Sequence, residues 1–376
     1  MEPLRWLATC PEDTKMVLVE ELRALGVEPS ARVFRGVRFE ADLATAYRLH
    51  LSLRTASRIQ RVVTEGEAPG LEAMSELAMA VDWTQWLRAH RPYRVQPVVP
   101  EGRDGEALAR VVAEAVSARF AGQAGPRYDA DHDYPVTIVA HWREGKLTLG
   151  LDTAGRALHK RGWRVNGHPA VLKETLAAAI LLLAGYDGTE PLLDPMCGSG
   201  TIAIEAAYIA LGKAPLIHRG KDDFGLEHHQ GFDRALWRQV SDEVRAEKRD
   251  TLAAPIFARD LRPDFVDLAR KGALRARVEK FITWAPGAIE ALDPPAAGGL
   301  LVANLPYGER IGRGEVERLY AGVGHALRQR YAGWRAALLV PADAPVHLLD
   351  LDRPVGHRLK NGSLDVRLLL TRDASG

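Results

Sequence analysis

Two short stretches of this 376-residue chain combine residue types that are suited to chemistry. The first, residues 194–201, reads Asp-Pro-Met-Cys-Gly-Ser-Gly-Thr. It follows the apolar residues 191–193 and precedes the alanine-rich residues 202–210, so the pattern predicts a strand, a glycine turn and a helix. Because glycine has no Cβ, a ligand can lie directly against the backbone of such a turn.

The ligand that suits this turn carries positive charge. The N-terminus of the helix that follows offers free N–H groups and a partial positive charge. Asp194, at the tip of the strand, would repel a pyrophosphate but can accept hydrogen bonds from an ammonium group. S-adenosylmethionine (SAM) has an amino acid part and a sulfonium, so the loop favours SAM over a dinucleotide.

The second stretch, Asn304-Leu305-Pro306-Tyr307, supplies what methyl transfer to an aromatic amine needs. The lone pair of an exocyclic amine is delocalised into the nucleobase. The Asn304 side-chain oxygen and the Leu305 carbonyl can each accept one N–H bond and turn that lone pair toward a methyl group. Pro306 stiffens the turn, and Tyr307 offers a face on which an extruded base can stack. Because SAM needs no further activation, positioning should carry much of the catalysis.

The composition is that of an ordinary globular protein, with 47% hydrophobic and 26% charged residues. The formal net charge of +1 does not by itself indicate a nucleic-acid binder. Cys10 and Cys197 lie far apart and form neither a disulfide framework nor a zinc pattern. His218, His228 and His229 lack metal-ligand spacing. Without a membrane-length apolar run or a signal-peptide pattern, the sequence predicts a cytoplasmic protein with no membrane or metal partner.

Residues 1–155 alternate short strand and helix signals, which is typical of small α+β modules. Strands are expected at residues 6–10, 36–40, 58–63 and 93–99, with a hairpin formed by 136–142 and 146–151. Helices are expected at residues 13–25, with Asp13 as N-cap, and at 43–51, from 71 onward and at 106–120.

From residue 169 onward the pattern becomes helices alternating with isolated apolar strands, which predicts a mainly parallel sheet. Helices are expected at residues 172–184, 201–211, 233–249, 264–276 and 315–331. Strands are expected at residues 192–194, 256–260, 300–304 and 336–340. The end differs, because residues 355–360 and 364–371 flank Asn361-Gly362 and predict an antiparallel hairpin. A parallel sheet that closes in such a hairpin suits a SAM-dependent methyltransferase better than a nicotinamide dehydrogenase.

Together these features resemble the THUMP-containing methyltransferases that modify guanine N2 in bacterial rRNA and in tRNA. The likeness covers nearly the whole chain. The stretches that carry it are residues 161–164, 173–178, 193–201 with 205–207, 304–310 and the tail 360–362.

The resemblance implies four segments and a division of labour between them. It implies an N-terminal ferredoxin-like module at residues 1–55, a THUMP RNA-binding module at 56–155, a basic linker at 156–168 and a Rossmann-like class I SAM-dependent methyltransferase domain of α/β fold at 169–376. SAM contacts carry over to the loop residues Asp194, Met196, Gly198, Ser199, Gly200 and Thr201. Asp260 is expected either to contact the SAM ribose, which we favour, or only to cap the helix that follows it. Base capture carries over to Asn304, Leu305, Pro306 and Tyr307.

The chain departs from the family pattern at three places. Leu305 stands where the catalytic motif usually has a second proline, but its carbonyl is retained. The acidic residue usually found near adenine falls at Gly287-Ala288, so we expect backbone recognition at Ala288. Residues 213–250, between the glycine loop and Asp260, look like a family-type insertion.

Two other features have more than one interpretation. Cys197 lies in the loop, but no pattern of a cytosine-C5 enzyme accompanies it, so we expect a small packing residue and not a nucleophile. The cluster Lys160, Arg161, Trp163 and Arg164 suits phosphate contact and base stacking, and equally suits a clamp between two domains.

The sequence thus predicts a SAM-dependent RNA methyltransferase that forms N2-methylguanosine and acts as a monomer on structured RNA. Residues 308–310 (Gly-Glu-Arg) favour the 23S rRNA branch of the family over the tRNA branch. Three alternatives remain: an adenine-N6 enzyme, an RNA-binding assembly factor with a vestigial SAM site, and a methyltransferase acting on a protein or small-molecule amine.

Overall fold

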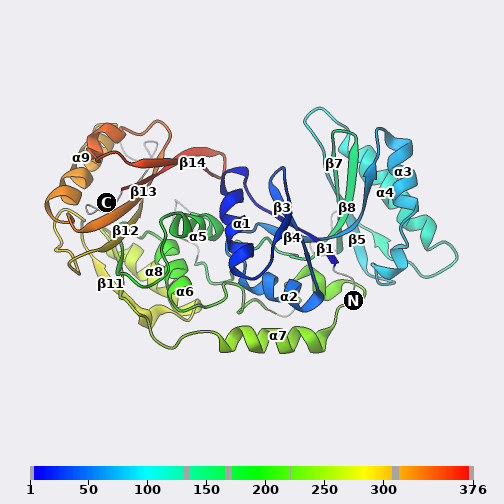
Figure 1. Ribbon diagram of the computed structural model, residues 1–376, viewed down its shortest axis with the longest axis horizontal. Helices are drawn as coiled ribbons and strands as arrows, with labels where there is room; N and C mark the ends of the chain where they lie inside the picture. Colours follow the sequence, from blue (N-terminus) through cyan, green and yellow to red (C-terminus); the bar gives the residue numbers. More distant parts are fainter. Residues whose placement is uncertain are drawn as a thin grey trace.

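Two sheets organise the chain, one in each half of the molecule (Figure 1). The computed structural model describes residues 4–130, 136–165, 167, 172–220, 222–306 and 313–371. In those ranges, no helix combines the length and the apolar character that a bilayer span requires.

The first sheet is mixed and continuous across the two expected N-terminal modules. Its strands are β1 (Leu4–Thr9), β2 (Pro29–Val33), β3 (Gly36–Ala41), β4 (Arg58–Glu67), β5 (Pro92–Val98), β6 (Arg127–Tyr128), β7 (Val136–Arg143) and β8 (Lys146–Asp152). Their order across the sheet is β2-β3-β1-β4-β8-β7-β5-β6. Strand β4 pairs antiparallel with β1 on one side and with β8 on the other, so it joins residues 1–55 to residues 56–155.

Each N-terminal module nevertheless has its own apolar core. The helices are α1 (Lys15–Ala24), α2 (Leu43–Ser52), α3 (Leu71–Met79) and α4 (Gly105–Arg119). Trp6, Leu18 and Tyr47 belong to the core of the first module. Trp83 and Val112 belong to the core of the second.

This half differs from the sequence prediction at the start of α1 and in strands β2 and β6. Helix α1 begins at Lys15, and Asp13 lies in the preceding 3-10 turn (Glu12–Thr14), so Asp13 is not its N-cap. Strand β2 was not predicted, because it is an edge strand with three exposed residues in succession and so lacks an alternating apolar pattern.

The second sheet has the predicted parallel core and antiparallel end. Its strands are β9 (Leu192–Asp194), β10 (Ile256–Asp260), β11 (Ile282–Pro286), β12 (Gly299–Asn304), β13 (Trp334–Pro341), β14 (Val355–Asn361) and β15 (Leu364–Leu370). The order is β11-β10-β9-β12-β13-β15-β14, and only β15 pairs antiparallel, with both β13 and β14. This arrangement confirms the predicted α/β class.

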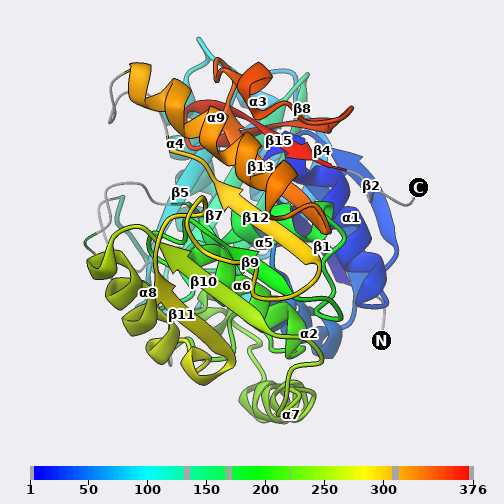
Figure 2. The same cartoon turned by 90° about the vertical axis from the view of Figure 1, so that its left-hand side faces the viewer.

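Helices cover both faces of this sheet (Figure 2). They are α5 (Glu174–Leu183), α6 (Thr201–Ala210), α8 (Pro263–Arg275) and α9 (Arg313–Gln329), whereas α7 (Arg234–Ala246) packs against the first N-terminal module. Along β12, Leu300 and Val302 pack into the core that contains α5, α6 and α8, whereas Leu301 and Ala303 pack into the core that contains α9. Because both faces are buried, the strand reads as a continuous apolar run.

The expected insertion, residues 213–250, crosses between the two halves. Buried residues of this segment complete the core of the first N-terminal module: Ala214, Leu216, Ile217, Phe224, Leu226, Val240 and Val244. Helix α7 runs beneath α2 (Figure 1), where the Asp233 N–H donates to the Tyr47 hydroxyl at 3.0 Å and Arg48 pairs with Glu247. The segment therefore fixes the position of the N-terminal half against the second half.

Candidate active site

A cavity of about 440 Å³ opens at the carboxyl ends of β9, β10 and β12. In the second sheet the connections run outward from β9 in both directions, and ligands bind at such a switch point in open α/β sheets. All the predicted cofactor residues except Gly200 line it: Asp194, Met196, Gly198, Ser199, Thr201, Asp260 and Ala288. Asn304, Leu305 and Pro306 line the same cavity, whereas Tyr307 lies outside the described residues.

The glycine loop folds as the sequence predicts, with positive φ angles of 51° at Gly198 and 75° at Gly200. The Cys197 N–H donates to the Arg259 carbonyl at 2.8 Å, which ties the loop to the end of β10. Gly200 is not among the residues that line the cavity, and its expected contact with the cofactor stays a prediction. A Cβ on Gly200 would lie 2.8 Å from the Cβ of Ala269 on α8, so the residue allows α6 and α8 to pack closely.

This close approach makes Gly200 a sensitive position. We expect Gly200→Ala to lower the free energy of unfolding by roughly 1–3 kcal/mol, because an L side chain is strained at this φ and the new methyl group meets Ala269. Urea denaturation would measure the loss. Gly26→Ala is the matched control, because Gly26 has a similar φ of 79° and no atom within 4 Å of the added Cβ. Equal losses in the two variants would show that packing against α8 contributes nothing.

Asp194 is the most deeply buried acid of the cavity, with 1% of its surface exposed. Its Oδ1 accepts from the Met196 N–H at 3.3 Å, and its Oδ2 has no hydrogen-bond partner within the described part of the chain. Burial, reinforced by the nearby charge of Asp260, raises the pKa of Asp194 well above its ordinary range. A cationic donor placed beside this carboxyl would stabilise its ionised form, which matches the ammonium group expected from the sequence.

Asp260 connects the two strand ends that border the cavity. Its Oδ2 accepts from the Gly198 N–H at 2.9 Å and its Oδ1 from the Arg262 N–H at 3.0 Å. The N-cap of α8 is Arg262, so Asp260 is not the residue that caps this helix. Each carboxylate oxygen keeps a further lone pair, and the expected ribose contact remains compatible with this geometry.

Asn304 ends β12 and stands half-buried at the cavity wall, and Leu305 follows it. The Leu305 side chain is fully buried in the core under α9, and its N–H donates to the Leu339 carbonyl at 3.0 Å. These contacts fix the backbone, so that the Leu305 carbonyl and the Asn304 amide can act as a rigid pair of acceptors.

Glu290 is a cavity residue that the sequence prediction missed. It is exposed and follows β11, a strand that was not predicted because the run Ile-Thr-Trp-Ala-Pro is short and interrupted. The family pattern has an acidic residue near adenine, and its position falls at Gly287-Ala288 in this chain. Glu290 supplies an acidic residue three positions after Gly287. Recognising the strand would have indicated that the residues after Pro286 reach the cavity.

Cys197 is buried, as its expected packing role requires. Burial, with the charges of Asp194 and Asp260, raises the pKa of the Cys197 thiol well above its usual range. A thiol that resists ionisation is a poor nucleophile.

The predicted RNA-binding cluster is divided by the structure. Trp163 is buried, and the Arg161 guanidinium is completely buried against Glu205, at 3.2 Å, and the carbonyls of Leu158 and Arg54. The prediction of RNA contact is therefore wrong for Arg161 and Trp163, and the alternative of an interdomain clamp holds. Arg164 is half-buried and pairs with Glu174 at 2.9 Å. Lys160 is exposed.

The cavity fits SAM by the chemistry of its donors and acceptors. Three carboxylates, those of Asp194, Asp260 and Glu290, line the cavity together with apolar side chains such as Ile202 and Leu319. Arg262 also lines it, and its guanidinium is paired with Asp264. The negative charge of the carboxylates suits a cationic cofactor and opposes a pyrophosphate. Among the described residues, no three His, Cys, Asp or Glu side chains are arranged so that they could hold a metal ion.

The sheet order and the cavity at its switch point define the class I SAM-dependent methyltransferase fold. Residues 161–369 match the RMKL-like methyltransferase domain, and residues 5–60 match the RlmL ferredoxin-like domain. The chain belongs to the RMKL-like methyltransferase family, which confirms the resemblance found in the sequence.

Individual relatives agree with this assignment. The ribosomal RNA large subunit methyltransferase K/L of Shewanella amazonensis is 34% identical over 368 residues, which cover 96% of this chain and 52% of that protein. The protein of the same name from Chromohalobacter salexigens is 34% identical over 98% of this chain and 52% of its own length. The chain thus spans about half the length of the curated relatives it matches. The crystal structure of SMU.472 complexed with SAH (S-adenosylhomocysteine) superposes over 100% of both chains with a TM-score of 0.88 and 26% identity.

Proposed function

We propose that this chain is a SAM-dependent RNA methyltransferase that forms N2-methylguanosine in 23S rRNA. The observation that carries the proposal is the meeting of Asp194 and Asn304 in one cavity, from two strands that are 110 residues apart in sequence. The relatives are named as methyltransferases of the large-subunit ribosomal RNA, and these names favour rRNA over tRNA as the substrate.

In this proposal the residues of the chain bind and orient SAM and the target base, and they exclude water from the cavity. Bound SAM supplies an electrophilic methyl group on its sulfonium. Asp194 holds the ammonium group of the cofactor, Asp260 holds the ribose, and the Ala288 backbone with Glu290 borders the adenine. Asn304 and the Leu305 carbonyl accept the two amino hydrogens of an extruded guanine, and Pro306 keeps the turn rigid. A stacking role for Tyr307 remains a prediction from the sequence.

The N-terminal half is proposed to dock the RNA. Residues 56–155 are proposed to be a THUMP module, on which Arg91, Arg103 and Arg110 are exposed. A single chain carries both the docking surface and the cavity, so a monomer suffices. A ribosomal RNA substrate would place the protein in the cytoplasm.

Product analysis tests the proposal directly. The protein would be incubated with methyl-labelled SAM and with unmodified 23S rRNA or tRNA transcripts, and the labelled nucleoside identified by mass spectrometry. We expect N2-methylguanosine in 23S rRNA. N6-methyladenosine would establish the adenine enzyme instead, and label in tRNA alone would establish the tRNA branch. SAM binding without transfer to either RNA would support an assembly factor.

The role of Asp194 predicts a pH-dependent affinity for SAM. Binding of an ammonium group favours the ionised carboxylate, so it should release a proton at pH values between the ordinary carboxyl pKa and the raised pKa of Asp194. SAM affinity should therefore increase as the pH rises through this window. We expect Asp194→Asn to weaken SAM binding roughly 10- to 100-fold and to remove the pH dependence.

Titration calorimetry in buffers of different ionisation enthalpy would measure both the affinity and the proton release. Asp250→Asn is the matched control, because Asp250 is almost fully exposed and does not line the cavity. A wild-type affinity that stays constant over this pH range would contradict the assigned role of Asp194.

A further inference from the structure

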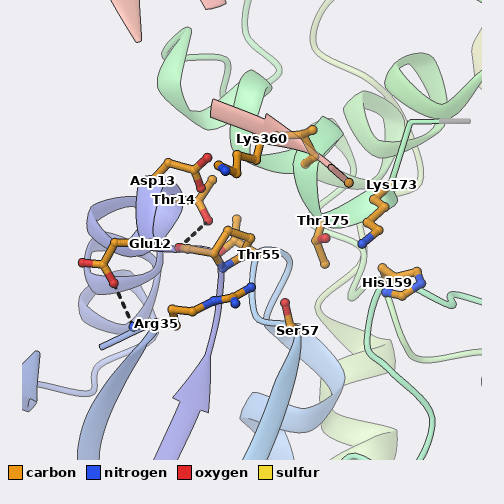
Figure 3. Close-up of a pocket in the computed structure, with 13 residues that line it drawn as sticks. Glu12, Asp13, Thr14, Arg35, Thr55, Ser57, His159, Lys173, Thr175 and Lys360 are labelled. Atoms are coloured by element: carbon orange, nitrogen blue, oxygen red, sulfur yellow. Dashed lines mark hydrogen bonds between the residues drawn. The ribbon is translucent and has the colours of Figure 1, made fainter. Parts of the chain in front are cut away.

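A second cavity, of about 340 Å³, lies between the two halves of the molecule. Its walls come from the segment after β1, from the start of α5 and from the end of β14. Figure 3 shows Arg35 on one side, Lys173 and His159 on the opposite side, and Lys360 above them. No function described so far uses this space.

The charge of this second cavity is positive once its ion pairs are assigned. Glu12 pairs with Lys15 and also accepts from the Arg35 backbone N–H at 2.8 Å. Lys360 pairs with Asp365 at 3.5 Å and lies beside Asp13 (Figure 3). The two carboxylate oxygens of Asp13 are buried without a hydrogen-bond partner in the described ranges, so Asp13 contributes one negative charge. Within the described residues, neither the Arg35 guanidinium nor the Lys173 ammonium takes part in an ion pair, and both side chains are exposed to solvent. Two cations are therefore available to an anion.

The cavity also presents hydrogen-bond donors that lack partners. Thr175 lines it with only 7% of its surface exposed, and its hydroxyl has no hydrogen-bond partner in the described ranges. Lys173 is the N-cap of α5 and provides no side-chain cap, so the first turn of α5 presents its N–H groups at the same wall. Arg164 holds this turn in place through Glu174 and the Leu172 carbonyl. The hydroxyl of the largely buried Thr175, the helix N-terminus and the two cations outside ion pairs together suit a phosphate.

The two cavities are neighbours along the chain. Leu172 lines the SAM cavity, and the next residue, Lys173, lines the second cavity. An anion held by Lys173 therefore lies beside the cavity in which the target base is proposed to be captured. An RNA strand has a phosphate at every nucleotide, so a strand that delivers one base to Asn304 can place a nearby phosphate at Lys173.

We propose that the second cavity binds a backbone phosphate of the RNA substrate, held by Lys173, Arg35 and the Thr175 hydroxyl. This inference rests on the proposed function, because it assumes an RNA substrate. The contact would be independent of sequence, and it would tie the strand to both halves of the protein at once. It would also orient the strand before the base enters the active site.

Salt-dependent RNA binding by the full chain tests this inference. The affinity for an unmodified 23S rRNA transcript would be measured at several KCl concentrations. We expect Lys173→Gln to weaken binding roughly tenfold and to reduce the slope of log affinity against log salt by about one. Thr175→Val should weaken binding without changing the slope, whereas Lys173→Arg should restore the slope. Lys271→Gln, which removes an exposed lysine on α8 outside the cavity, is the control.

The outcomes separate this inference from the proposed function. If the wild type binds and methylates the transcript but Lys173→Gln behaves like Lys271→Gln, the phosphate site alone is refuted. If the wild type neither binds nor methylates the transcript, both proposals fall together. Inorganic phosphate provides a further arm. Phosphate binding that is lost in Lys173→Gln, with RNA binding unchanged, would identify a site for a free anion and overturn the assignment to RNA.

Discussion

The variant Asn304→Ala should reduce the rate of methyl transfer to 23S rRNA roughly a thousandfold. Asn304 is proposed to hold one amino hydrogen of guanine while the Leu305 carbonyl holds the other. Losing one of two preorganised polar groups at a reacting centre typically costs a factor of 100 to 1000. The amide stands at the end of β12, on the wall of the same cavity that Asp194 lines.

The measurement is the single-turnover rate with saturating SAM and RNA. SAM affinity, measured separately, should change less than threefold, because Asp194 and Asp260 remain in place. Gln239→Ala, which removes a side-chain amide on the exposed face of α7, should keep the wild-type rate. A rate for Asn304→Ala above one tenth of the wild-type rate would refute the assigned role of Asn304.

The variant Arg161→Gln should lower the free energy of unfolding by roughly 3–5 kcal/mol. Both Arg161 and Glu205 are completely buried, and removal of the guanidinium leaves the Glu205 carboxylate in the interior without its cation. The carbonyls of Leu158 and Arg54 lose their donors at the same time. The double variant Arg161→Met with Glu205→Leu removes both charges and should recover much of the loss, which identifies the uncompensated charge as its cause.

Urea denaturation monitored by circular dichroism would give these energies. Arg245→Gln is the matched control, because Arg245 forms an exposed ion pair with Asp242, at 2.8 Å and three residues away, and should cost at most about 1 kcal/mol. If Arg161→Gln resembled this control in stability but reduced the salt dependence of RNA binding, the original prediction of RNA contact would be right and the clamp wrong.

The sequence was sufficient to predict β9, β10 and β12, the three strands whose carboxyl ends border the active site. Strands β9 and β12 are short apolar runs followed by distinctive polar residues, and parallel strands bring their carboxyl ends to one edge of the sheet. For this reason Asp194 and Asn304 could be placed together without coordinates. Glu290 escaped prediction because its position depends on β11, whose five residues carry no clear period.

What the sequence could not show is which surfaces meet over long distances. Arg161 looked like an RNA contact because its neighbours are basic, while its partner Glu205 lies 44 residues further along. Helix α7 has an amphipathic pattern that predicts a buried face but does not name the surface that covers it. Whether the apolar face of α7 packs against the first or the second half of the molecule depends on tertiary packing.

The placement of residues 214–244 has a consequence for synthesis on the ribosome. The core around Trp6 and Tyr47 remains incomplete until these residues, encoded nearly 200 positions later, have emerged. During synthesis the amino-terminal half therefore exposes apolar surface until these residues are available. Its folding is completed at the same stage as the folding of the first strands of the catalytic half. The two halves should consequently unfold in a single cooperative transition instead of as independent domains.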